Sequence, residues 1–322
     1  MKEKIKYAGA MLICFIAVLF IRMPVMADDG VPATAWRDYA AADFAGGSGT
    51  ETDPYRITDG AQLAKIAKDV ENGTVYKDAY FRLENDIDLS AHRWNPIGVY
   101  KCYADTTDNR MFSGFLDGNG KTITGLIVDE RTEKNRAGLF GKITCIGTAT
   151  NVGVKDLNIV DARIYATNEG MKSSSSAILA GMVMTNPGDT VRFDDISVSG
   201  TIVNTSVGDN SMISGGLFGE AYRVTADNCR ADVMIEGGDN TGGFVGLDGS
   251  STYRNCKVTG KVTGLWSIGG FVGYAGEAES TTMSTFDNCI AKVAVMASTG
   301  VPEDLRDTWR RESLHPVPHS VM

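Results

Sequence analysis

The sequence predicts an all-β chain that folds as a right-handed parallel β-helix (solenoid) with an N-terminal capping helix. Three observations predict this class: a repeat of 27 residues, a two-residue alternation of apolar and polar side chains within each repeat, and glycines at fixed intervals. The 322 residues include 37 glycines and 43% hydrophobic residues, enough for a substantial core. This composition argues against a disordered acidic segment and against a collagen-like fibre.

Residues 1–27 resemble a secretory signal peptide. Lysines in the first six residues precede an apolar run from Ala8 to Ile21, and Val25-Met26-Ala27 offers suitable residues before a cleavage site. The run is short for a membrane span, and an uncleaved N-terminal anchor is the alternative. Cleavage would remove four of 31 basic and one of 40 acidic residues, which leaves a formal charge of −12. We therefore expect a secreted or cell-surface protein that binds no nucleic acid and no membrane after signal cleavage.

The repeat is clearest after residue 228. Cys229, Cys256 and Cys289 each follow an asparagine, and the first two are followed, fourteen positions later, by the second glycine of a Gly-Gly-Phe-Val-Gly motif. These motifs occupy residues 242–246 and 269–273, and earlier, looser copies occupy 215–219, 180–183 and 138–141. A β-propeller is the less favoured alternative, because its blades need about 40 residues each.

Alternating side chains within a unit predict which strand face is buried. Residues two apart share one face of a strand. Cys229, Ala231, Val233 and Ile235 are therefore expected to face the core. The same pattern predicts solvent-facing charges at Arg230, Asp232, Lys257, Lys261 and Lys292. We expect the motif glycines to form coil corners, either by adopting positive φ or by allowing neighbouring backbones to approach closely.

The remaining segments have distinct expected roles. Residues 28–48 are expected to form a flexible leader, and 49–100 an N-terminal cap that includes helix 59–71 and the first strands. Asp59 can cap this helix, because Gln62 follows three residues later, and a solenoid end requires a cover over its core. Residues 101–300 are the parallel β-helix, and 301–322 an irregular or short helical tail or the end of a truncated chain.

Several motifs in order resemble a known family. Tyr80–Leu89, Trp94–Gly98 and Phe112–Leu126 precede the Gly-Leu-Phe-Gly and Gly-Phe-Val-Gly units. Over about residues 49–273 the chain resembles the GLUG-motif bacterial surface proteins, which are similar to pectin-lyase-like β-helices. The resemblance implies an extracellular stalk, adhesin or cell-surface module, sometimes ahead of other domains. It implies no catalytic residues.

Candidate catalytic and metal-binding residues are few. The three histidines form no His-Glu-x-x-His motif, and Asp117-Gly118-Asn119-Gly120-Lys121 resembles the start of a calcium loop but has Lys121 in place of an oxygen ligand. The better interpretation of that segment is a tight turn between strands. The acid pairs Asp86/Asp88 and Asp194/Asp195 resemble the carboxyl pairs of glycosidases, and Trp94 and Trp266 are not visibly clustered. We expect no catalytic, cofactor-binding or metal-binding residues and no cofactor.

Cleavage of the signal would leave five cysteines, which cannot all pair within the chain. Because Cys229, Cys256 and Cys289 occupy equivalent inward positions on parallel neighbours, their Cβ atoms converge poorly for bridging, and we expect free buried thiols.

The sequence thus favours an exported, non-catalytic cell-surface or adhesive β-helix module, a fragment of a larger surface protein, with a host or cell-wall glycan or protein as partner. One alternative is a carbohydrate-active β-helix enzyme, either a polysaccharide lyase or a glycosidase. Another is a structural spacer for a C-terminal domain such as a protease.

Overall fold

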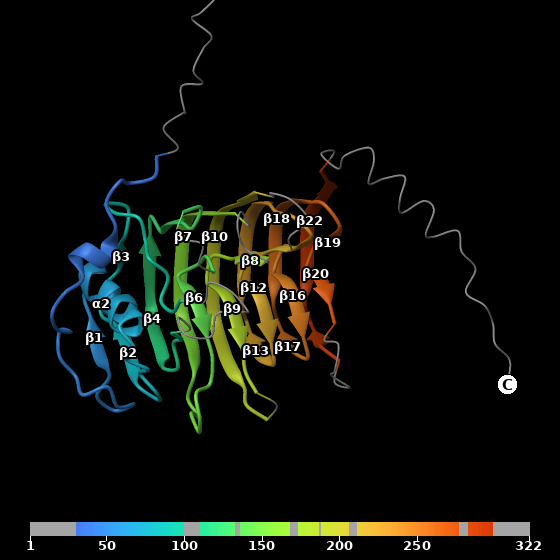
Figure 1. Cartoon of the computed structure of the whole chain (residues 1–322). Coiled ribbons are helices and arrows are strands. Elements are labelled where there is room, and N and C mark those ends of the chain that lie inside the picture. The colour runs from blue at the N-terminus through green and yellow to red at the C-terminus, as the bar shows by residue number, and fades with distance from the viewer. Residues whose placement is uncertain are drawn as a thin grey trace, which may run out of the picture. The chain divides into compact units, whose positions relative to one another are not determined.

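The computed structural model describes residues 30–99, 110–132, 136–167, 173–186, 188–205, 211–276 and 283–298 (Figure 1). The chain divides into two units, residues 1–31 and 32–322, and the fold below is that of the second. The predicted signal peptide and C-terminal tail lie outside the described residues. Within the described ranges, no helix is both long and apolar enough to cross a membrane.

Three β-sheets make up the second unit, and every pairing between the named strands described below is parallel. The first sheet has 13 strands: β1 (Tyr55–Ile57), β2 (Tyr80–Leu83), β3 (Ile87–Asp88), β4 (Phe115–Thr124), β5 (Ile127–Asp129), β7 (Gly153–Thr167), β10 (Val191–Thr205), β13 (Val224–Asp227), β14 (Arg230–Glu236), β17 (Thr252–Arg254), β18 (Lys257–Gly264), β21 (Thr285–Asp287) and β22 (Ile290–Ala297).

Two smaller sheets complete each coil. The four-stranded sheet contains β8 (Ser173–Ser176), β11 (Ser211–Gly215), β15 (Asn240–Gly242) and β19 (Ser267–Gly269). The five-stranded sheet contains β6 (Phe140–Ile143), β9 (Ala180–Met184), β12 (Phe218–Tyr222), β16 (Val245–Gly249) and β20 (Val272–Ala275). The chain visits the three sheets in turn, so successive strands of each sheet come from successive coils, as Figure 1 shows.

The register between coils confirms the predicted repeat. Arg230 pairs with Lys257 in the first sheet, Asn240 with Ser267 in the second and Val245 with Val272 in the third, each a separation of 27 residues. The predicted fold class, an all-β parallel solenoid with one N-terminal capping helix, is confirmed.

The capping helix α2 (Gly60–Glu71) forms as the sequence predicts. The Asp59 side chain accepts a hydrogen bond from the Gln62 backbone N–H at 2.8 Å, and the Gln62 side chain accepts one from the Thr58 N–H at 2.8 Å. Together these bonds satisfy two N–H groups at the start of the helix. The buried face, Leu63, Ile66, Ala67 and Val70, belongs to the same hydrophobic core as the first strands.

Residues 32–48 belong to this cap rather than to a flexible leader. The short 3-10 helix η1 (Trp36–Tyr39) is held by a hydrogen bond of 2.9 Å from Trp36 Nε1 to the Leu89 carbonyl. The Phe44 ring stacks on Tyr55 with centroids 4.8 Å apart. The sequence interpretation gave no weight to these two aromatic side chains, whose apolar surface is better satisfied against the cap than in water.

The predicted inward and outward faces are confirmed through the middle of the solenoid. Cys229, Ala231, Val233 and Ile235 are buried, while the residues between them are exposed. Along the interior, the rings of Phe193, Phe218, Phe244 and Phe271 follow one another with centroid separations of 4.6, 6.2 and 4.6 Å. Burial decreases at the last described coil, where Val295 is 45% exposed.

Non-glycine residues, and not the motif glycines, provide the left-handed corners of the coils. Six residues at equivalent corners have φ between 50° and 56°: Asn119, Asp156, Asp195, Asn228, Asn255 and Asn288. Asparagine and aspartate tolerate this conformation better than other non-glycine residues. The side chains also connect neighbouring coils, because Asn255 donates to Asp227 at 2.9 Å and Asn288 donates to Asn255 at 2.8 Å. The Asn-Cys repeat in the sequence is therefore this corner and the first buried residue after it.

The motif glycines allow close backbone approach instead. None of the nine glycines in the three Gly-Gly-x-x-Gly units has a positive φ, so that part of the prediction is wrong. A Cβ on the first glycine of each unit would overlap a carbonyl within its own unit, as Gly242 does with Val245. A Cβ on the third would meet the carbonyl of the preceding coil, at 2.8 Å from Gly246 to Gly219. The predicted close approach is confirmed.

Candidate functional site

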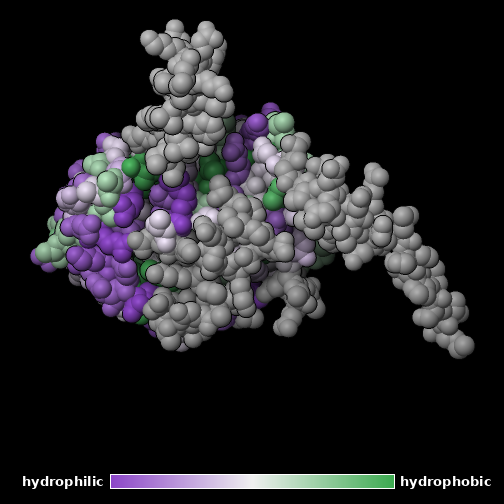
Figure 2. Space-filling view, turned by 45° about the horizontal axis from the view of Figure 1, so that its top comes forward, coloured by the Kyte–Doolittle hydropathy of each residue, from purple (hydrophilic) through white to green (hydrophobic). Residues whose placement is uncertain are grey.

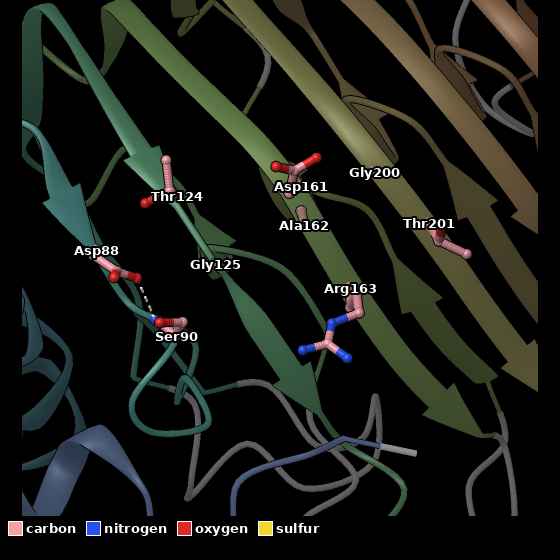
Figure 3. A pocket seen from close by; sticks show the side chains of 9 residues that line it. All are labelled: Asp88, Ser90, Thr124, Gly125, Asp161, Ala162, Arg163, Gly200 and Thr201. Atoms are coloured by element: carbon pink, nitrogen blue, oxygen red, sulfur yellow. Dashed lines mark hydrogen bonds between the residues drawn. The ribbon is translucent and has the colours of Figure 1, made fainter. Parts of the chain in front are cut away.

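A pocket of about 490 Å³ opens on the outward side of the 13-stranded sheet (Figure 3). It crosses the sheet from β3 and β4 to β7 and β10. Its lining consists of Asp88, Ser90, Thr124, Gly125, Asp161, Ala162, Arg163, Gly200 and Thr201. We call this the sheet pocket.

A bulge and two glycines create the hollow. The pairing of β7 with β10 shifts register between Val198 and Gly200, and Asp161 in the bulged strand has φ 56°. A bulge inserts an extra residue and re-aims a side chain, which here leaves Asp161 exposed in the pocket. Gly125 and Gly200 contribute no side chains, so the space above them stays open.

The polar groups of the sheet pocket carry both signs of charge. The Ser90 backbone N–H donates to Asp88 Oδ1 at 2.8 Å, and this bond, with the Ser90 hydroxyl, lowers the pKa of Asp88. Asp88 and Asp161 are exposed, and Arg163 on β7 is half-buried between its strand neighbours (Figure 3). No aromatic side chain lines the pocket. Its carboxylates, guanidinium and hydroxyls suit a polar, hydroxylated ligand better than an apolar one.

The structure separates the acid pair Asp86/Asp88. Asp88 lines the sheet pocket, whereas Asp86 accepts a hydrogen bond from the Thr122 backbone N–H at 2.8 Å and is not part of the lining. The sequence pattern identified one pocket residue of the nine. Asp161 and Arg163 were missed, because the bulge that exposes them follows from the pairing of β7 with β10 and leaves no local motif.

The pair Asp194/Asp195 lies at a coil corner. Asp195 is one of the left-handed corner residues, and its carboxylate accepts a hydrogen bond from Asn228 Nδ2. Burial raises the pKa of Asp194, Arg192 opposes that shift, and the neighbouring carboxylates of Asp227 and Asp195 add to it. This pair joins neighbouring coils.

The segment Asp117–Lys121 is a turn within β4, as the better interpretation of the sequence expected. Asn119 has φ 53°, its N–H bonds to Asp117 Oδ1 at 2.8 Å and its amide donates to the Leu83 carbonyl at 3.1 Å. Asp117 also forms an ion pair with Lys155 at 3.3 Å. Across the described ranges, no group of three His, Cys, Asp or Glu side chains is arranged to hold a metal ion.

The tryptophans and the described histidine are far from forming a shared platform. Trp94 is buried and donates from Nε1 to the Leu139 carbonyl at 3.0 Å, whereas Trp266 is 48% exposed. His92 stacks on Tyr39 in the cap, with ring centroids 3.9 Å apart. His315 and His319 lie outside the described residues.

A buried charge cluster, not anticipated from the sequence, joins three coils. Arg136 and Glu220 form an ion pair at 3.3 Å, with side chains 1% and 5% exposed. The Ser175 hydroxyl donates to Glu220, and Lys142 lies nearby on β6. Burial lowers the pKa of Lys142 to about 8, which Glu220 partly opposes. These residues are isolated in the sequence, so no spacing could have linked them.

The repeated cysteines are free, as predicted, and so is Cys145. Cys229 and Cys256 are buried, with Sγ 3.2 Å from the Asp227 carbonyl and 3.1 Å from the Arg254 carbonyl, whereas Cys289 is half-buried. Burial raises the pKa of the Cys229 thiol, and the hydrogen bond with Cys229 lowers that of Cys256. Cys102 lies outside the described residues.

Comparison with known proteins gave two curated relatives and one solved structure, and no family model matches the chain. The chain is 32% identical over 184 residues to halomucin from Haloquadratum walsbyi, covering 56% of this chain and 2% of halomucin. It is 36% identical over 118 residues to a candidate Gly-rich membrane protein from Evansella cellulosilytica, covering 34% of this chain and 12% of that protein. The chain thus spans only a small part of the length of either relative.

The solved structure is a candidate immunoglobulin A1 protease from Bacteroides ovatus, with a TM-score of 0.49 and 16% sequence identity. The alignment covers 84% of this chain and 93% of that chain.

Proposed function

We propose that the chain is an exported, non-catalytic cell-surface module that uses the outward side of its 13-stranded sheet for adhesion. The observation that carries this proposal is the sheet pocket, which places two carboxylates, a guanidinium and three hydroxyls on a scaffold of paired strands. Such polar groups can bind a hydroxylated ligand without covalent chemistry. The face in Figure 2 is largely hydrophilic over the coloured residues, which suits a ligand bound from water.

The comparisons support a surface location. Both relatives carry names that belong to the cell exterior or membrane, a mucin-like name and a membrane protein. The resemblance to GLUG-motif surface proteins and the signal-like residues 1–27 point the same way. Secretion or display at the extracellular surface is therefore part of the proposal, with a host or cell-wall glycan or protein as partner.

A glycan array combined with a polysaccharide-degradation assay tests the proposal on the exported chain. We expect binding to at least one immobilised polymer and no release of reducing or unsaturated ends from any polymer. Turnover of any polymer would overturn the non-catalytic assignment. Recovery of the native chain in the cytoplasm of its own cells would overturn the surface assignment.

The sheet pocket also favours one alternative, a carbohydrate-active enzyme. Asp88, Asp161 and Arg163 are groups that glycosidases and lyases use, and the pocket gathers them from separate coils. If the degradation assay shows turnover, the variants D88N and D161N should abolish it while T201A should not. A chain that serves only as a spacer for a C-terminal domain such as a protease would be negative in both assays.

A further inference from the structure

We propose that the outward face of β14, β18 and β22 binds an acidic polysaccharide. The contact residues are Arg230, Lys257, Lys261 and Lys292, which we call the basic strip. The inference rests on the proposed adhesive function and names the class of ligand.

Strand register gathers the basic strip from three successive coils. Arg230 on β14 pairs with Lys257 on β18, and Thr259, two residues along, pairs with Lys292 on β22. Lys261 pairs with Met234 on one side and Ala294 on the other. Neighbouring strands lie about 4.8 Å apart, so the four cations repeat at short, regular intervals across the sheet.

All four side chains are available to a ligand. Each is exposed, and none forms an ion pair with another described residue. The nearest acid on the face, Asp232, already accepts a hydrogen bond from Thr259 Oγ1 at 2.8 Å. The cations are therefore held by the sheet without being neutralised by it.

The local charge is opposite to that of the chain. The full sequence has a formal charge of −9, yet the outward face of these strands carries four basic residues against Asp232 and Glu236. A patch of one sign on a protein of the other attracts polymers selectively, over about 10 Å at 0.1 M ionic strength. This favours an anionic partner at this face and disfavours one elsewhere.

The shape of the face favours a polysaccharide over an acidic protein. A regular strand face offers point charges with hydroxyls between them, here Thr259 and Thr263, and the exposed Met234 for the apolar side of a sugar ring. The row also continues toward the sheet pocket, because Arg163 pairs with Thr201 and Thr201 pairs with Met234. An extended polymer lying across the strands would reach from the basic strip into the pocket.

The test measures binding of the exported full chain to polygalacturonate and heparin, with neutral dextran as the uncharged probe. The double variant K257E/K261E reverses the centre of the basic strip. The matched control K68E makes the same kind of change at an exposed lysine on α2. We expect K257E/K261E to weaken binding by at least about tenfold, K68E to have little effect, and salt to weaken binding by the wild type.

Several results would overturn the inference. These are an equal loss in K68E, unchanged binding in K257E/K261E, or tighter wild-type binding to duplex DNA or to an acidic protein than to either polymer. Binding to dextran that neither variant alters would remove the basic strip and leave the adhesive function standing. Cleavage of a polymer would instead remove the non-catalytic function. Circular dichroism of the variants verifies that the fold is unchanged.

Discussion

Gly243 packs against the carbonyl group of Gly270 on the next coil, so a Cβ at Gly243 would overlap that oxygen and lie 2.9 Å from Val258 Cγ2. Gly270 holds the same motif position one coil later. There, the nearest atom to an added Cβ is the Ala291 Cβ, at 3.4 Å. The two glycines share a sequence context and differ in the space around them, so they form a matched pair.

Alanine at these two positions should have unequal effects. We expect G243A to lower the free energy of unfolding by about 2 kcal/mol or more, because the backbones of two coils would have to separate. G270A meets only ordinary contacts and should change stability by less than about 0.5 kcal/mol. Urea denaturation monitored by circular dichroism measures both, and equal losses would contradict the close-approach explanation.

The corner residue Asn255 allows a test of the left-handed turn. Its φ is 52°, and its side chain bonds to Asp227 on one coil and Asn288 on the other. N255A should lose about 1–2 kcal/mol through strain and lost hydrogen bonds. N255G removes the same bonds without the strain, so it should lose less. If alanine proved as stable as glycine in urea denaturation, the corner would not depend on φ.

The buried charge cluster should tolerate removal of both charges better than removal of one. R136M leaves the Glu220 carboxylate buried without its guanidinium and should cost about 3–5 kcal/mol. The double variant R136M/E220L replaces the pair with apolar side chains and should recover most of that loss. Thermal unfolding of the two variants and the wild type makes the comparison. A double variant less stable than R136M would contradict the expectation.

Lys142 should give the protein a distinctive alkaline stability. Burial lowers its folded-state pKa from 10.5 to about 8, so between these values the unfolded chain binds more protons than the folded one. Stability from this group therefore rises with pH from about 8 to about 10.5, and a penalty remains at neutral pH. K142M should remove that rise, seen as a flatter plot of denaturation midpoint against pH. The control K68M changes an exposed lysine, and a K142M slope equal to that of the control would contradict the assignment.

The cysteines should react in order of exposure. Cys289 is half-buried, while Cys229 and Cys256 are buried. A short pulse of alkylating reagent on the native protein should modify Cys289 first, as mass spectrometry of peptides would show. After denaturation without reductant, all three should be modified. Fewer than three free thiols would contradict the prediction that they are unpaired.

Features that depend on a local pattern could be predicted from the sequence. The capping helix, the inward and outward strand faces and the 27-residue repeat all follow from spacing within one segment. The source of the corners was misassigned, because glycine was the expected left-handed residue and Asn228, Asn255 and Asn288 take that role. Physical chemistry permits both choices, and only the backbone φ distinguishes them.

The sheet pocket depends on coil length, which the sequence does not reveal where the repeat is irregular. Leu157 pairs with Ile196, Ser197 with Arg230 and Arg230 with Lys257, separations of 39, 33 and 27 residues. Residues from coils of different length come together only once these registers are known. The charge cluster was hidden for the same reason, because Arg136 and Glu220 meet across an irregular part of the chain.

The equal 27-residue separation in all three sheets means that one coil is related to the next by translation alone. A duplicated 27-residue unit would therefore carry its own corner asparagine, its own core residues and its own close-packed glycines. It would lengthen the molecule by about 4.8 Å, one strand spacing, without altering the capping helix or the sheet pocket. Growth by whole units gives this architecture a length that evolution can change in small, equal steps.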